Sequence, residues 1–315
     1  MKSWKRKNQR TGVICLNIVL LLILVNISPL WAKSMDNIKY LFSFQTRRSG
    51  CMVRVNNIPI IDNFTYSTGT ISTGGNITSF VENGENSVEV MMGPVDQYDN
   101  NTLYPDSECI LTITRDTINT SQHVTTMKLS VDNDKKIVAS LSSNYDGLHS
   151  EGRISESQTP FSKEQNLHRI SRDVNLSDLP EWAWVKATPV SEKDLPAIKE
   201  VYTTIWKAMH NRDIDALKKM TAISGKEMGQ AEGITADLVF SSYGLSEKLQ
   251  DTDLSIVDLS WKEKELVTYC DGRLFRLATG IYQNSPLKLK NKDGKTVFTY
   301  NPYLSIINGK IVIVR

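Results

Sequence analysis

The sequence predicts a multi-domain chain in which an N-terminal all-β sandwich is followed by an α+β domain, helices first and then an antiparallel meander. Two observations predict this fold class. Across residues 36–140 apolar and polar residues alternate with a period of two, and turn residues interrupt the runs at short intervals, as in β-sandwiches. Across residues 177–315 helical periods come first and hairpin-forming strands follow, which is typical of an α+β layout.

The first part of the chain has the layout of a secretory signal. It begins with basic residues and no acid, continues with the apolar run Val13–Val25, and reaches the small residue Ala32. The positive charges stay on the cytoplasmic side while the apolar run enters the translocon. Residues 1–32 are therefore expected to be a signal peptide cut before Lys33. The alternative is an uncleaved anchor, because residues 13–32 approach the length that crosses a bilayer.

Both interpretations place the rest of the chain in the periplasm, and the anchor would also hold it at the inner membrane. The net charge of +2 for the whole chain comes from this targeting segment. Five of the 37 Lys and Arg residues lie within it, which leaves 32 against 35 Asp and Glu, a net charge of −3. Nucleic-acid binding requires a basic surface. The sequence therefore predicts no nucleic-acid partner.

The β domain is predicted strand by strand. Asn56-Asn57 has the composition of a tight hairpin turn, and Asn83-Gly84 precedes another strand. Strands are expected at Ile38 to Phe44, Met52 to Val55, Ile58 to Ile61, Ser87 to Met92, Ile110 to Ile113, Met127 to Val131 and Ile137 to Ala139. These short, regularly interrupted runs, with no long helical period among them, indicate an all-β sandwich.

The cysteines outside the targeting segment are Cys51, Cys109 and Cys270. Cys51 and Cys109 both open strand-like runs of the β domain, and we expect them to form a disulfide in an oxidising compartment. Cys270 is left over. We expect it to be a buried small apolar residue, with a reactive thiol or an intermolecular bridge as the alternative.

An acidic segment is the main functional feature of the β domain. Between Val55 and Leu111 there is no Lys or Arg. A stretch of one sign can steer a cationic partner, so we expect this surface to contact another protein, a basic one. The alternative is a solvated acidic face without a partner. The residues expected at the contact are Asp62, Glu82, Glu85, Glu89, Asp96, Tyr98, Asp99, Tyr104 and Asp106.

The loop from Asp96 to Asp106 is rich in oxygen-bearing side chains, but its spacing lacks the pattern of a calcium loop. The sequence predicts no metal site and no cofactor. Residues 141–176 are polar, with few apolar positions, and are expected to form a flexible linker. Its two histidines are too far apart to suggest a zinc site.

The α+β domain is predicted to span residues 177–315. Ser191 and Asp194 form a capping box ahead of an amphipathic helix, Asp213 is expected to cap a second helix, and Gly233 to end a third. A second capping box is expected at Ser224 to Glu227. A less distinct helical stretch runs from Ala236 to Leu249, and hairpin turns are expected at Asp271-Gly272, Asp293-Gly294 and Asn308-Gly309.

The run Lys199 to Met209, the following Arg212 to Leu217, and the terminal Asn308 to Val312 resemble the opening helices and last hairpin of the nuclear-transport-factor-like (SnoaL-like) families. The resemblance implies a cone-shaped α+β domain. These families include enzymes, binding modules and toxin-neutralising proteins, and their enzymes place an Asp or His in the cone.

The positions that match this expectation are His210, Asp213 and Asp271. Each also has a local explanation, as a cation at a helix C-terminus, a helix N-cap and a turn residue. We therefore predict no catalytic residue. Trp182, Trp184 and His210 are the residues expected to line a pocket. The alternative for the two tryptophans is that they pack the start of this domain onto its sheet.

The whole chain also resembles uncharacterised exported proteins of Gram-negative bacteria, some of which stand beside secreted toxins as immunity partners. The function expected from the sequence is a non-catalytic exported binding protein of the envelope, with toxin neutralisation in the periplasm as its specific form. One alternative is a small-molecule enzyme or carrier that uses the C-terminal cone. The other is a structural or adhesive module built on the β domain.

Overall fold

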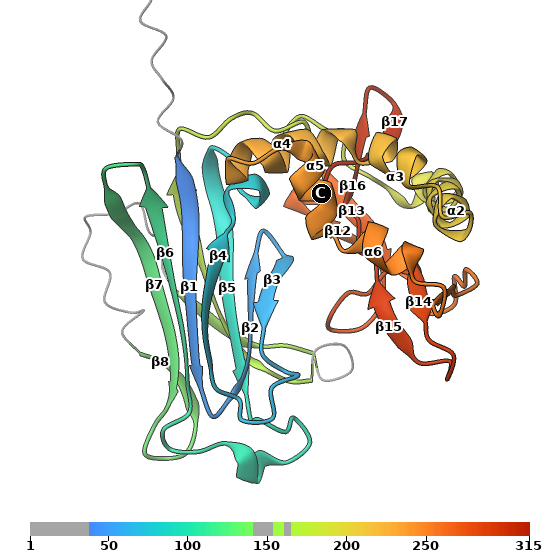
Figure 1. Cartoon of the computed structure of the whole chain (residues 1–315). Helices are drawn as coiled ribbons and strands as arrows, with labels where there is room; N and C mark the ends of the chain where they lie inside the picture. Colours follow the sequence, from blue (N-terminus) through green and yellow to red (C-terminus); the bar gives the residue numbers. More distant parts are fainter. Residues whose placement is uncertain (1–37, 141–153, 161–164) are drawn as a thin grey trace, which may run out of the picture. The chain divides into compact units, whose positions relative to one another are not determined.

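The computed structural model describes residues 38–140, 154–160 and 165–315, which belong to one compact unit (Figure 1). The expected fold class is confirmed: two antiparallel sheets come first, and helices followed by two further antiparallel sheets come second. Within the described residues no helix is long and apolar enough to cross a membrane. The predicted signal segment, residues 1–32, lies outside the described part of the chain.

The sandwich consists of two five-stranded sheets. One sheet has the order β4-β1-β6-β7-β8 and the other the order β3-β2-β5-β10-β9, with every pair antiparallel. The strands are β1 (Lys39–Arg47), β2 (Gly50–Val55), β3 (Ile58–Asp62), β4 (Ile71–Asn76), β5 (Gly84–Gly93), β6 (Glu108–Asp116), β7 (Ser121–Val131), β8 (Ile137–Ser140), β9 (Ser155–Gln158) and β10 (His168–Leu176). The predicted strands are all present.

Alternating side chains of both sheets form the sandwich core, which includes Phe44, Val53, Val90 and Leu111. The disulfide between Cys51 of β2 and Cys109 of β6 lies in this core and joins one sheet to the other, as predicted. The Asn56-Asn57 turn is also confirmed. Both residues have a positive φ, which two-residue hairpin turns require.

The prediction of a flexible linker over residues 141–176 is wrong for the two stretches that form strands β9 and β10, which pair with each other. His168–Leu176 forms strand β10, which pairs with β5 along its whole length and contributes Ile170, Val174 and Leu176 to the core. Arg172 interrupts the series of inward-facing apolar residues along β10. It is buried and donates to the Thr125 hydroxyl (3.1 Å). An arginine at an inward-facing position breaks the apolar periodicity from which a strand is predicted.

The helices are α2 (Leu195–His210), α3 (Ile214–Met220), α4 (Ala222–Glu232), α5 (Ala236–Ser242) and α6 (Leu245–Gln250). The Ser191–Asp194 capping box is present, Asp213 accepts from the amide of Ala216, and Gly233 ends α4 in the left-handed conformation. The stretch expected to be one helix from Ala236 is broken at Gly244, which has a positive φ.

The capping box predicted at Ser224 to Glu227 is wrong. Helix α4 begins two residues earlier, at Ala222, so both side chains lie inside the helix. The Ser224 hydroxyl bonds to the phenol of Tyr243 (2.6 Å) instead. The Glu227 carboxylate is used in a tertiary contact with Arg315, described below.

Two small sheets complete the fold. The first, sheet C, has the order β12-β13-β16-β17, and the second, sheet D, the order β11-β14-β15. Their strands are β11 (Ser255–Ile256), β12 (Glu265–Tyr269), β13 (Leu274–Ala278), β14 (Lys288–Lys290), β15 (Thr296–Thr299), β16 (Leu304–Ile307) and β17 (Lys310–Ile313). Asp271-Gly272, Asp293-Gly294 and Asn308-Gly309 lie between consecutive strands, as predicted.

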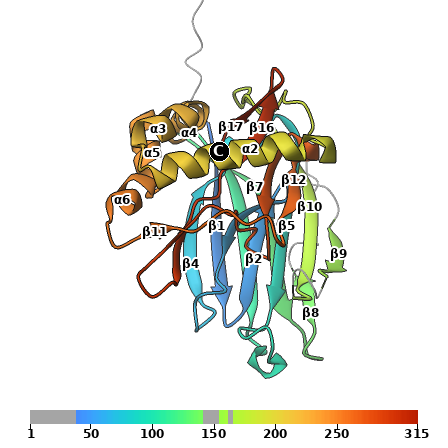
Figure 2. The same cartoon turned by 90° about the vertical axis from the view of Figure 1, so that its right-hand side faces the viewer.

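Helix α2 lies across sheet C (Figure 2) and packs on one of its faces. On that face Tyr202 and Ile205 of α2 share an apolar cluster with Phe275 and Leu304. The opposite face contributes Tyr269 and Leu274 to a separate cluster, which includes Ile58 of strand β3 and the two tryptophans Trp182 and Trp184. Sheet C is therefore buried on both sides, by helix α2 and by the sandwich.

Candidate functional site

The nine residues predicted to bind a partner do not form one surface. Asp96, Tyr98, Asp99, Tyr104 and Asp106 belong to the β5–β6 loop, residues 94–107, at the end of the sandwich drawn at the bottom of Figure 1. Asp62 ends β3 at the same end. Glu82 and Glu85 lie at the opposite end, at the start of β5, and Glu89 lies midway along that strand.

Tertiary pairing also neutralises several of these acids with bases from outside the segment. Glu82 forms a two-point ion pair with Arg273 (2.7 and 2.5 Å). Glu89 pairs with Arg169 (3.3 Å) across neighbouring strands, and Asp106 pairs with Arg48 (3.0 Å).

Asp96 and Asp99 differ from these acids, because neither forms an ion pair within the described residues. Asp62 is half-buried, and this burial raises the pKa of its carboxyl above its ordinary value. Within the described residues, the acids of the predicted surface that are both exposed and without an ion pair are Asp96, Asp99 and Glu85.

The β5–β6 loop is organised by its own side chains. Asp96 accepts from the amide of Tyr98 (3.0 Å), and Asp99 accepts from the amide of Asn101 (2.9 Å). The Thr102 hydroxyl accepts from the amide of Asp96 (2.9 Å) and donates to the carbonyl of Asp99 (2.7 Å). Such short polar side chains hold turns by bonding to nearby backbone groups. The loop thus has a defined shape, while Asp96, Tyr98 and Asp99 on it stay exposed.

Tyr98 is the most exposed aromatic residue of the described chain, with 82% of its surface accessible. The amide of Tyr98 is held by Asp96, so the backbone that carries the ring is held in place. Arg48, which follows strand β1, contacts the second half of the loop. Its guanidinium lies 3.4 Å from the ring centre of Tyr104 and pairs with Asp106. This end of the sandwich therefore presents one exposed aromatic ring on a structured acidic loop.

Buried Asn63 joins neighbouring segments by hydrogen bonds at the same end of the sandwich. Its amide oxygen accepts from the Cys51 amide (2.7 Å), and its amide nitrogen donates to Ser49 and Thr46 (2.8 Å each). Sequence reasoning missed this residue. An Asn after a strand has the composition of an ordinary turn, and no local pattern distinguishes a buried amide.

Trp182 and Trp184 do not line a described pocket but hold the α+β region on the sandwich. Both indoles are buried and donate to backbone carbonyls of the segment that precedes β5, Trp182 to Val81 (3.0 Å) and Trp184 to Ser79 (3.3 Å). The Arg273 guanidinium lies over Trp184 (5.6 Å). This placement agrees with the packing alternative for the two tryptophans.

Arg315 contacts the indole of Trp182 in the way that Arg273 contacts the indole of Trp184. Its guanidinium lies over Trp182 (5.4 Å), donates to the carbonyl of Ser79 (2.7 Å) and pairs with Glu227 of α4 (2.6 Å). Glu227 in turn accepts from the amide of Ala183 (2.6 Å). Sequence analysis assigned no role to Arg315, because its partners are far away along the chain.

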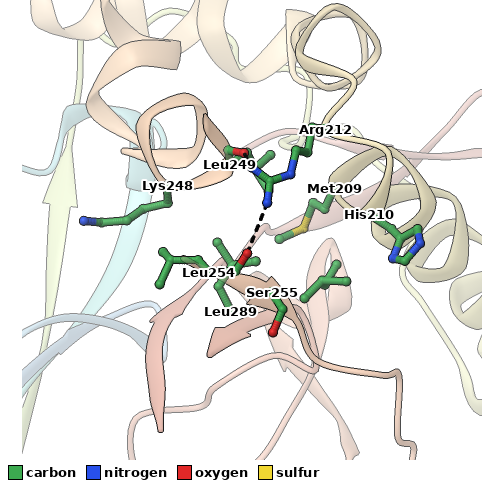
Figure 3. Close-up of a pocket in the computed structure, with 9 residues that line it drawn as sticks. Met209, His210, Arg212, Lys248, Leu249, Leu254, Ser255 and Leu289 are labelled. Atoms are coloured by element: carbon green, nitrogen blue, oxygen red, sulfur yellow. Dashed lines mark hydrogen bonds between the residues drawn. The ribbon is translucent and has the colours of Figure 1, made fainter. Parts of the chain in front are cut away.

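His210 lies at the edge of a cavity of about 210 Å³ (Figure 3). Arg212 closes one side by donating to the carbonyls of Leu249 (2.6 Å) and Leu254 (3.2 Å), and Lys248 and His210 lie on opposite sides. The His210 ring is stacked on Trp206 (4.9 Å). The cavity is lined by Met209, His210, Arg212, Lys248, Leu249, Leu254, Ser255, Ile256 and Leu289.

This cavity is smaller than the range of about 300 to 1,000 Å³ in which small-molecule sites fall. The space between α2 and sheet C is occupied by the apolar cluster that includes Tyr202 and Phe275. Asp213 is the N-cap of α3, and Asp271 is an exposed turn residue. Within the described residues, no group of His, Cys, Asp and Glu side chains is arranged to hold a metal ion.

Comparison of the chain with protein-family models, with curated proteins and with solved structures finds no match.

Proposed function

We propose that this chain is an exported, non-catalytic binding protein that recognises a partner protein through the β5–β6 loop. The observation that carries the proposal is the exposed ring of Tyr98 on a loop whose backbone is fixed by Asp96, Asp99 and Thr102. Tyrosine supplies a large contact area with little conformational entropy to lose, and it is enriched where proteins bind one another. A preorganised loop lowers the cost of binding further.

The charge of the loop supports a basic partner. Asp96 and Asp99 are exposed and form no ion pair with the described residues, so their charges act outwards. Exposed carboxylates of this kind raise the association rate with a basic surface and add modestly to affinity. Binding through this loop should therefore depend on salt.

The Cys51–Cys109 disulfide supports export, because structural disulfides persist in oxidising compartments. It joins the start of β2 to the start of β6, close to the same end of the sandwich as the loop. We propose the periplasm as the compartment. Toxin neutralisation is the specific form of the function that we propose, with a secreted basic toxin as the partner.

The proposal is tested by capture from envelope extract with the chain from Lys33 to Arg315, tagged at its N-terminus so that buried Arg315 is not disturbed. Captured proteins are identified and then purified for titration. We expect one basic partner, bound more weakly at high salt. Tyr98→Ala should weaken binding by about tenfold or more, the loss typical of an interface hot spot.

The charge is tested separately with Asp96→Asn and Asp99→Asn combined. Asparagine keeps the oxygen that accepts the backbone hydrogen bonds, so the loop keeps its shape while its charge is removed. We expect a slower association rate and a weaker salt dependence. Glu85→Gln, an exposed acid at the opposite end, is the matched control and should bind like the unaltered chain.

If Tyr98→Ala binds the partner with unchanged affinity, the loop is not the contact surface. Inhibition of the purified partner's toxic activity by the unaltered chain, and not by Tyr98→Ala, would support the toxin-neutralising form.

A further inference from the structure

A second cavity, of about 300 Å³, lies beside strand β17, the edge strand of sheet C. Helix α2 forms one wall, the α3–α4 junction forms the other, and the strand lies between them. The cavity is lined by Val201, Thr204, Ile205, Lys219, Met220, Ala222, Ile223, Ile311, Val312 and Ile313. A single strand edge therefore meets a mostly apolar groove.

The backbone of β17 has unused hydrogen-bonding groups on this side. In a two-residue hairpin the closing pair, here Ile307 and Lys310, exchanges both hydrogen bonds, and bonded pairs then alternate with non-bonded ones. The bond from the Val314 amide to the Tyr303 carbonyl (2.9 Å) fits this alternation. Ile311 therefore falls in a non-bonded pair.

Ile313 falls in a non-bonded pair for the same reason. The N–H and C=O groups of Ile311 and Ile313 thus point away from β16, towards the free edge. Within the described chain no hydrogen bond to these groups is present. Ile313 is nevertheless 2% exposed, and buried backbone groups are almost always paired. The edge is therefore short of hydrogen-bond partners.

The groove carries one charge. Lys219 is the charged residue of its lining, and it forms no ion pair within the described residues. The adjacent Lys218 differs, because it pairs with Asp237 (3.1 Å) and does not line the groove. Thr204 supplies a hydroxyl on the α2 wall. The remaining lining side chains are apolar.

We propose that this groove binds an extended peptide segment of a partner protein, which adds a strand to the edge of β17. Its main chain would pair with the free groups of Ile311 and Ile313, and one apolar side chain would enter the cavity. A carboxylate of the peptide, from an acidic side chain or from the chain end, would face Lys219. Strand addition of this kind takes affinity from main-chain hydrogen bonds and specificity from side-chain pockets.

The free backbone groups favour a peptide over an acyl chain. A hydrocarbon tail would cover the N–H and C=O groups of Ile311 and Ile313 without bonding to them, which is unfavourable in an apolar site. A peptide satisfies them and still places an apolar side chain against the walls. This site is separate from the β5–β6 loop and does not depend on the proposed function of that loop.

The test selects a library of random heptapeptides, displayed with free C-termini, on the chain from Lys33 to Arg315. Enriched peptides are synthesised and their binding is measured by fluorescence anisotropy. Thr204→Trp fills the groove from an exposed position on α2, and Lys207→Trp, exposed on the same helix outside the groove, is the control. We expect Thr204→Trp to lower affinity by about tenfold or more and Lys207→Trp to leave it unchanged.

Three further arms identify the contacts. Two N-methylated forms of each peptide are compared, one methylated at the odd-numbered amides and the other at the even-numbered amides. One of the two forms should lose binding, because methylation removes the N–H groups that bond to the strand. Lys219→Glu should weaken binding several-fold, whereas Lys218→Glu should not. Replacing the peptide's terminal carboxylate by an amide distinguishes the chain end from an acidic side chain as the group that faces Lys219.

The proposal is overturned if no peptide is enriched on the unaltered chain over Thr204→Trp, or if both N-methylated forms bind as well as the parent. Binding of laurate without peptide enrichment would also overturn it and assign the cavity to an amphiphile. Tyr98→Ala should bind the peptides normally, so failure of this proposal and failure of the loop proposal are distinguishable.

Discussion

The terminal guanidinium of Arg315 lies 2.6 Å from the carboxylate of Glu227, and the Arg315 side chain is completely buried. The pair joins the last residue of the chain to the middle of helix α4, and the same guanidinium donates to the carbonyl of Ser79 in the sandwich. One side chain therefore ties together the C-terminus, the helices and the β domain.

Arg315→Met should destabilise the chain by about 3 to 5 kcal/mol, because it leaves the carboxylate of Glu227 in a buried position without its partner. The free energy of unfolding from guanidinium chloride titration measures the effect. The double variant Arg315→Met with Glu227→Gln should recover part of the loss, since no unpaired charge remains. Equal losses in the single and double variants would show that the charge pair is not the cause.

Trp184→Phe should cost about 1 kcal/mol, because it removes the hydrogen bond to the Ser79 carbonyl while keeping an aromatic ring in the site. Trp184→Ala should cost about 3 to 5 kcal/mol, since it also leaves a cavity. Trp261→Phe is the control, because the indole nitrogen of Trp261 makes no hydrogen bond within the described residues and that indole is not fully buried. A phenylalanine variant of Trp184 as stable as the unaltered chain would argue against an anchoring role for the indole N–H.

Removal of the disulfide by Cys51→Ala with Cys109→Ala should lower the free energy of unfolding by about 4 kcal/mol, from the chain entropy of closing the loop between residues 58 positions apart. The two denaturation curves should be compared without reductant. With excess reductant, the free energy of unfolding of the unaltered chain should fall towards that of the double variant. Identical curves in both conditions would mean that the disulfide contributes nothing to stability.

Cys270 should resist alkylation in the folded chain. Burial raises the pKa of its thiol to about 12, and the thiolate is the reactive form. An ordinary thiol with a pKa of about 8.5 becomes strongly more reactive between about pH 7 and pH 9. Cys270 should stay almost fully protonated over this interval and react slowly throughout. Mass spectrometry after iodoacetamide treatment checks this, with the denatured chain as the positive control, and rapid labelling that rises with pH in the folded chain would contradict it.

Much of the sandwich could be predicted because alternation and turn residues are local properties. The Asn56-Asn57 hairpin and the strands on either side follow from residues that are neighbours in the sequence. Strand β10 could not be found in this way, because Arg172 occupies an inward position and its cost is offset by a tertiary contact with Thr125. The order of helices and sheets agrees with the expected α+β layout, and membership of a nuclear-transport-factor-like family stays a prediction.

The candidate sites were only partly predictable. Tyr98 and its neighbouring acids stand together in the sequence, so their loop could be recognised as a polar aromatic segment. The ion pair between Glu82 and Arg273 could not be predicted, because the two residues are 191 positions apart in the sequence. The groove beside β17 gave no sequence signal, since its walls come from α2, the α3–α4 junction and the last strand.

The sequence by itself determined the local elements, the signal-like N-terminus as an expectation, and the pair of cysteines available for a disulfide. Periodicity and turn chemistry act between residues a few positions apart, and one chain displays them without any fold. The tertiary structure alone decided which acids are neutralised, where the tryptophans are anchored and which strand edge stays open. Those outcomes depend on which distant segments are brought into contact, and that is set by the packing of whole sheets and helices rather than by any local pattern.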